Sequence, residues 1–156
     1  MTFKTNPVDE SFFETAPFRI SADFDIPRPA SSVWADLTGD QALSWCRIIQ
    51  SVRWTSERPF GVGTTRQVRT LGLVVLHEHY FRWEEGRRHS FYAVSATLPM
   101  FRSLAEDYLV EPTSEGSCRF TWTIVADARG GRAMAPGNRL LLGSLFRDTR
   151  RYYGTA

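Results

Sequence analysis

Cysteine is scarce in this chain, and long apolar runs are missing. Only two of the 156 residues are cysteines, Cys46 and Cys118, and they lie far apart. A disulfide framework in a secreted chain needs more than this. No stretch approaches the roughly 20 apolar residues that a transmembrane helix requires, and the first residues lack the apolar centre of a signal peptide. We therefore expect a cytoplasmic protein without stable membrane insertion.

Neither basic nor acidic residues predominate. The 19 basic and 17 acidic residues give a net charge of +2. The basic residues are scattered apart from short pairs such as Arg87-Arg88, which we interpret as solvated surface. This balance argues against a nucleic-acid-binding surface. Gly61-Val62-Gly63 lacks the third glycine of a dinucleotide fingerprint and follows no βαβ pattern, so we predict no cofactor.

Aromatic residues, by contrast, are abundant. They make up 13% of the chain, with five tryptophans and eleven phenylalanines that must be packed somewhere. The length suits one domain with a substantial core. Residues 1–17 show no clear hydrophobic period, and we interpret them as an N-terminal leader that lies over the surface or is partly mobile. Residues 18–156 then form a single domain.

This domain begins with a strand and continues mainly with strands. Apolar and polar residues alternate from Phe18 to Ile26, which is typical of a half-buried strand. Pro27 ends the strand because proline cannot donate to a ladder. A short helix can then begin at Ser31 or Ser32, and a second at Asp40. Turn signals separate six further strands, which we place at 48–54, 64–71, 73–83, 88–98, 101–111 and 119–127.

A long amphipathic helix follows these strands. Leu141, Leu145 and Phe146 recur at helical spacing after Asn138, a plausible helix cap. Hairpin-length turns between the strands predict an antiparallel meander, and one helix can cover one face of it, which gives an α+β architecture. A strongly twisted sheet has more inner surface than one helix covers. We therefore expect a mostly apolar cavity between sheet and helix.

The order of these pieces resembles that of a known superfamily. A proline precedes a Val33-Trp34 helix, a Gly-x-Gly turn stands at 61–63, Glu78 precedes the turn at 83–88, and Thr121-Trp122 lies in the last hairpin. The chain is similar to the START/SRPBCC superfamily, in particular its bacterial polyketide cyclase/dehydrase-like branch. The resemblance implies a helix-grip fold: a curved seven-stranded antiparallel sheet around a long C-terminal helix, with two short helices after the first strand.

Glu78 is the first candidate for a functional site. It shares a strand face with Leu76 and Tyr80, and the resemblance implies that its side chain points into the cavity. A carboxylate in apolar surroundings needs a partner or a raised pKa. Arg66 or Arg69 on the neighbouring strand could supply that partner. The alternative is a solvent-facing Glu78 between two solvent-facing histidines.

Further candidates follow from strand parity and residue type. Glu106 is favoured over Asp107 as a second inward carboxylate, and Tyr92 and Tyr108 could orient a ligand oxygen. The side chains that we expect to bind the ligand are Trp45, Arg66, Glu78, Tyr92, Glu106, Tyr108, Trp122, Leu141 and Leu145.

The sequence gives little support for a metal site or for a nucleophilic active site. His77 and His79 share a strand face and could chelate an ion together, but nothing supplies a third ligand, so we predict no metal site. The chain has no Gly-x-Ser-x-Gly elbow and no recognisable Cys/His pair. If the protein is an enzyme, we expect Glu78 to act in acid/base catalysis.

Three functions remain open on this evidence. The first is binding or carriage of a small hydrophobic ligand, such as a lipid or polyketide-like molecule, in the internal cavity. The second is a cyclase, aromatase or dehydratase that acts on a polyketide-like chain. The third is a partner-binding module whose cavity is filled by side chains. Fold alone cannot choose among them, and the sequence leaves open whether the chain is a monomer or a homodimer.

Overall fold

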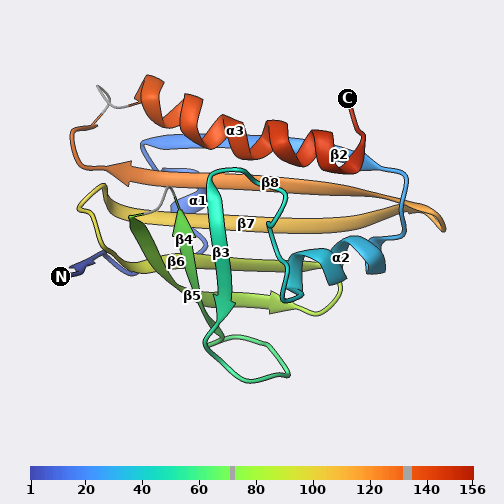
Figure 1. Ribbon diagram of the computed structural model, residues 1–156, viewed down its shortest axis with the longest axis horizontal. Coiled ribbons are helices and arrows are strands. Elements are labelled where there is room, and N and C mark those ends of the chain that lie inside the picture. The colour runs from blue at the N-terminus through green and yellow to red at the C-terminus, as the bar shows by residue number, and fades with distance from the viewer. Residues whose placement is uncertain (71–72, 132–134) are drawn as a thin grey trace.

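In the part of the chain that the structure describes, eight strands form one antiparallel sheet, and a long C-terminal helix lies along it (Figure 1). The computed structural model describes residues 1–70, 73–131 and 135–156. The strands are β1 (Phe3–Lys4), β2 (Phe18–Ile26), β3 (Ile49–Trp54), β4 (Thr65–Thr70), β5 (Val74–Glu84), β6 (Arg88–Ala96), β7 (Phe101–Ser114) and β8 (Ser117–Ala128). The helices are α1 (Phe12–Thr15), α2 (Ala30–Thr38) and α3 (Ala135–Tyr153).

The sheet is the predicted meander, closed at one edge by the first long strand. Its neighbours follow the order β3-β4-β5-β6-β7-β8-β2, all antiparallel, with β1 added to β6. Pairing of β2 with β8 places Phe24 against Phe120, with ring centroids 5.4 Å apart. Phe120, Trp122 and Ile124 are all at most 1% exposed, because alternate residues of β8 face the core. The curved antiparallel sheet and C-terminal helix of the helix-grip fold are thus confirmed.

The second of the two predicted short helices is not a helix. Residues 40–45 form successive turns instead, in which Ala42 N–H bonds to the Gly39 carbonyl and Cys46 N–H to the Leu43 carbonyl. Leu43 has a φ of 60°, a left-handed conformation that interrupts a right-handed helix. This turn nevertheless buries the Leu43 side chain, which is 2% exposed.

The C-terminal helix α3 begins at Ala135, earlier than the predicted start near Asn138. Pro136 is compatible with this start because the first N–H groups of a helix have no partner within it. Leu145 and Phe146 are buried while Arg147 is exposed, so one face of α3 packs on the sheet. Among the residues that the structure describes, no helix is long and apolar enough to cross a membrane.

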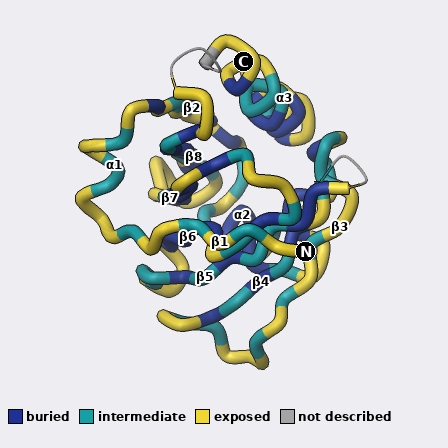
Figure 2. Tube along the Cα trace, turned by 90° about the vertical axis from the view of Figure 1, so that its left-hand side faces the viewer, coloured by how far each residue is buried: buried dark blue, intermediate teal, exposed yellow. Residues whose placement is uncertain are grey.

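The N-terminal segment lies against the outer side of the sheet. Phe3 pairs with Ala96 of β6, and the ring of Phe13 in α1 lies 6.3 Å from that of Phe81. Residues 1–17 are exposed or half-buried throughout, as Figure 2 shows. The segment therefore covers the sheet without contributing a fully buried side chain.

A histidine lies in the middle of the aromatic core. His89 is 0% exposed, and its ring lies 4.8 Å from that of Tyr108, 5.1 Å from Tyr80 and 5.2 Å from Trp83. Neither of its ring nitrogens has a hydrogen-bond partner among the described residues. Burial, and then the positive charge of Arg66, hold the pKa of His89 well below its usual value, so the ring is neutral in the folded protein.

We expect acid to destabilise the fold through His89. Below a pH of about 6.5 the unfolded chain binds a proton that the folded chain excludes, so stability falls by about 1.4 kcal/mol per pH unit. Urea unfolding of the wild type and of His89→Leu at pH 7.5 and 5.5 tests this. The variant should lose about 1.4 kcal/mol less than the wild type between the two pH values. Equal losses in both proteins would contradict the assignment.

Candidate functional site

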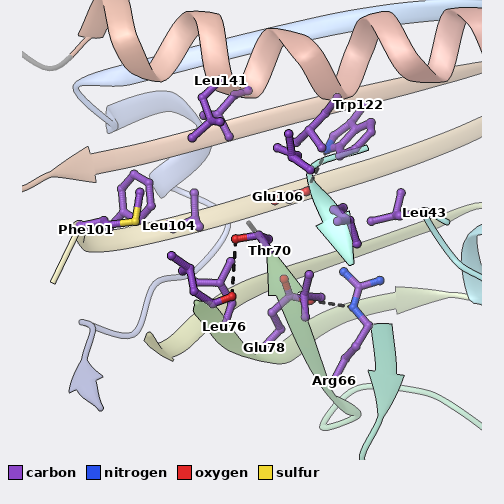
Figure 3. A pocket seen from close by; sticks show the side chains of 17 residues that line it. Leu43, Arg66, Thr70, Leu76, Glu78, Phe101, Leu104, Glu106, Trp122 and Leu141 are labelled. Atoms are coloured by element: carbon purple, nitrogen blue, oxygen red, sulfur yellow. Dashed lines mark hydrogen bonds and ion pairs between the residues drawn. The ribbon is translucent and has the colours of Figure 1, made fainter. Parts of the chain in front are cut away.

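A pocket lies between the inner face of the sheet and α3 (Figure 3). The centre of a water-sized molecule can occupy about 80 Å³ of it, which is room for several waters. Its walls are apolar except for three ionisable side chains and the hydroxyl group of Thr70. The lining residues are Leu43, Ile48, Ile49, Arg66, Val68, Thr70, Val74, Leu76, Glu78, Met100, Phe101, Leu104, Glu106, Trp122, Leu141, Leu142 and Leu145.

The pocket has a charged end and an apolar end, because the inward-facing residues of β4 and β5 change from charged to mainly apolar along the strands. On β4 and β5 the inward residues pair as Arg66 with Glu78, Val68 with Leu76, and Thr70 with Val74. The charged pair is buried, whereas Thr70 and Leu76 are half-buried. Met100, Leu141 and Leu142 are half-buried as well, so the accessible end is lined mainly by hydrocarbon.

At the charged end Arg66 and Glu78 form an ion pair. Arg66 Nε donates to Glu78 Oε2 over 2.7 Å, and the two side chains are 1% and 5% exposed. The guanidinium lies over the ring of Phe91, 4.7 Å from its centroid, and also near Trp54 and Tyr80. Glu78 thus lines the pocket and is shielded from solvent.

Each partner of this pair acts on the charge of the other. Burial raises the pKa of Glu78, and the nearby guanidinium opposes that rise. Burial works against the charge of Arg66, but the attraction and hydrogen bond of Glu78, together with smaller contributions from Tyr80 and Tyr108, raise the pKa of Arg66 overall. Arg66 therefore stays protonated. Arg69, the other predicted partner, is exposed on the opposite face of β4.

Glu106 is the second carboxyl group of the pocket. Its Oε2 accepts hydrogen bonds from Trp122 Nε1 at 2.9 Å and from the Tyr108 hydroxyl at 3.2 Å. Burial, reinforced by the negative charge of Glu78, raises the pKa of Glu106 to about 7. Glu106 can therefore hold or release a proton near neutral pH, which is the property required of a general acid or base.

Six of the nine side chains that we expected to bind the ligand line the pocket, and three do not. Trp45 instead stacks on Tyr152 of α3 with ring centroids 4.4 Å apart, and its Nε1 donates to Thr149 Oγ1. Tyr92 lies on the outer face of the sheet, opposite His79. Tyr108 is fully buried and reaches the pocket only through its hydrogen bond to Glu106.

These three differences have physical causes. The side chains of Phe91 and Ala93 occupy the inner face of β6, so Tyr92 between them must point outward. Tyr108 does point inward, but the rings of Phe120, Trp122 and Phe91 surround it. Parity identifies the face on which a side chain lies, whereas lining a pocket also requires that no neighbour cover it.

Most of the apolar lining residues did not appear among the sequence candidates. Strand parity carried on from Arg66 would have identified Val68 and Thr70, and parity from Glu106 would have identified Leu104. Leu43 comes from the irregular turn before β3, and no periodic signal points to it. Within the described ranges, no three potential metal ligands gather in one place.

Comparison with known proteins is consistent with this geometry. A family model described as polyketide cyclase / dehydrase and lipid transport matches residues 17–151. Uncharacterized proteins of Mycobacterium tuberculosis and Mycobacterium bovis are each 34% identical over 148 residues, which cover 91% of this chain and 88% of the relative.

Solved structures share the fold at low sequence identity. A START superfamily protein from Mycobacterium smegmatis has a TM-score of 0.71 at 10% identity, over 87% of this chain and 97% of that one. A major latex-like protein from Panax ginseng has a TM-score of 0.62 at 19% identity, over the same shares of 87% and 97%. With the family match over most of its length, this chain belongs to the polyketide cyclase/dehydrase and lipid transport family.

Proposed function

We propose that this protein binds a small hydrophobic molecule in the pocket between its sheet and α3. The supporting observation is a pocket with mainly hydrocarbon walls and a few convergent polar groups, the usual composition of a small-molecule site. The family description, which names lipid transport, agrees with such a ligand. The pocket is small beside the roughly 300–1,000 Å³ of drug-sized sites. A slim chain or a single ring therefore suits it better than a fused-ring polyketide.

A second candidate function is acid/base catalysis on the bound molecule. The observation in its favour is Glu106, a pocket carboxyl group whose pKa is raised to about 7. Glu78, the carboxylate expected to be catalytic, is held by Arg66 at 2.7 Å and is less free to exchange a proton. If the protein catalyses a reaction, we therefore assign the proton transfer to Glu106.

Filling the pocket tests the binding function. We expect native mass spectrometry of gently purified protein to show a bound small molecule, and added octan-1-ol to raise the melting temperature. Leu104→Trp places an indole in the pocket and should weaken binding by at least about tenfold, although the added bulk also costs stability. Val62→Trp serves as the matched control, because Val62 is 69% exposed and is not a lining residue.

Circular dichroism should establish that both variants are folded. Binding that survives in folded Leu104→Trp would place the ligand elsewhere. A wild type with no bound mass and no thermal shift from octan-1-ol or n-octane would count against ligand binding altogether.

A further inference from the structure

The charged end of the pocket has hydrogen-bonding capacity that the protein does not use. Arg66 Nη1 is buried and has no hydrogen-bond partner among the described residues. Figure 3 shows the terminal nitrogens of Arg66 directed away from the Glu78 contact. Both hydrogen bonds that reach Glu106 end on Oε2, so within the described ranges Oε1 accepts none. One donor and one acceptor thus remain open at the same end.

Buried polar groups in folded proteins are nearly always satisfied, so the unsatisfied buried donor of Arg66, beside an acceptor on the half-buried Glu106, indicates what the ligand must bring. The matching group must accept a hydrogen bond from the guanidinium and donate one to the carboxyl oxygen. A hydroxyl group does both. An ammonium group cannot accept a hydrogen bond, so it would leave Arg66 Nη1 without a partner.

Building on the proposed binding function, we infer that the ligand is a neutral amphiphile with one terminal hydroxyl group, which enters the pocket first. The hydroxyl donates to Glu106 Oε1 and accepts from Arg66. The hydrocarbon body then lies along Val68, Leu76 and Leu104 toward Met100 and Leu141. In this orientation the polar head is buried and the apolar tail faces the half-buried end of the pocket.

The charges of the pocket disfavour a carboxylate head. Arg66 supplies one positive charge, against two carboxyl groups. A ligand carboxylate would be a third acid, and its binding would require Glu106 to keep its proton. Because the pKa of Glu106 is about 7, the affinity for a carboxylate should fall about tenfold per pH unit above neutrality. An alcohol can donate to the carboxylate form of Glu106 and accept from the protonated form, so its binding should vary little with pH.

A set of four probes with the same eight-carbon chain tests the inference. Isothermal titration should measure octan-1-ol, octanoate, octylamine and n-octane at pH 6 and pH 8. At pH 8 we expect octan-1-ol to bind at least about tenfold more tightly than each of the others. Octanoate should gain about tenfold at pH 6, while octan-1-ol stays unchanged.

Glu106→Gln provides the variant that keeps the shape and removes the charge. In this variant the pH dependence of octanoate binding should disappear, and the gap between octan-1-ol and octanoate at pH 8 should close by at least about tenfold. Glu115→Gln is the matched control, since Glu115 lies in the exposed turn between β7 and β8. The control should reproduce the wild-type preferences.

The outcomes separate this inference from the binding function on which it rests. Octanoate that equals octan-1-ol at pH 8, or n-octane that equals octan-1-ol, would overturn the hydroxyl assignment while supporting a hydrophobic site. A Glu106→Gln variant with wild-type preferences would overturn it too. Failure of all four probes to bind the wild type would overturn the binding function itself.

Discussion

Replacing Arg66 by methionine is expected to lower the free energy of unfolding by about 3–5 kcal/mol. Arg66 and Glu78 are at most 5% exposed and joined at 2.7 Å. Removal of the guanidinium leaves Glu78 buried without a counter-charge, and water cannot replace the lost interaction. The loss should shrink in acid, where Glu78 can take up a proton. Urea unfolding at pH 7.5 and pH 4 measures both effects.

Two comparisons make this result specific. Arg119→Met removes one partner of the exposed Arg119–Asp25 pair, whose atoms are 2.8 Å apart, and should cost no more than about 1 kcal/mol. The double variant Arg66→Met/Glu78→Leu replaces the buried pair by hydrocarbon and should recover most of the loss. If Arg66→Met lowered the free energy of unfolding no more than Arg119→Met does, Arg66 would not be needed to neutralise the buried charge of Glu78.

Glu106→Gln, by contrast, is expected to stabilise the protein at pH 8, by up to about 3 kcal/mol. The pKa of Glu106 is about 7 in the folded chain, against 4.5 as its ordinary value. Between these values the folded chain binds a proton that the unfolded chain has released. The contribution of Glu106 to the free energy of unfolding is therefore fully present below about pH 4.5 and is lost as the pH rises through about 7.

Glutamine removes this loss and keeps an oxygen that can accept from Trp122 and Tyr108. Chemical unfolding at pH 8 and pH 4 measures the effect. The free energy of unfolding of Glu106→Gln should exceed that of the wild type by a large margin at pH 8 and by almost nothing at pH 4. Glu115→Gln, at an exposed position, should match the wild type at each pH. A Glu106→Gln gain that did not depend on pH would show that the carboxyl group titrates normally.

Taken with the binding experiment, a stabilised variant with altered ligand preference would indicate a residue retained for function at some cost in stability.

Much of the fold could be predicted from the sequence because it rests on local periodicity. The alternation from Phe18 to Ile26 coincides with β2, and the hairpin turns led to the meander of β3 to β8. The turn around Leu43 could not be predicted this way. Its positive φ is adopted where burial of the side chain compensates for an unfavourable local conformation, and burial depends on residues far along the chain.

The candidate site likewise contains residues that strand alternation could predict and residues that it could not. Strand alternation already placed Glu78 on one face with Leu76 but left Arg66 and Arg69 open as its partner, and the register between β4 and β5 selects Arg66. The side chains of Trp45 and Tyr92 were chosen by residue type, and their neighbours in space place both outside the pocket: Tyr152 covers Trp45, and Tyr92 lies beyond the inner face of β6.

The sequence by itself determined the succession of strands and which of their side chains share a face, because a period of two can be recognised from neighbouring residues. Only the tertiary structure decided the chemistry of the pocket. The pKa of Glu106 and its free oxygen depend on Trp122 and Glu78, which lie on other strands. The open donor of Arg66 depends on rings that close around it from β3, β5 and β6. Such properties arise from distances and burial in space, which alternation along a strand does not encode.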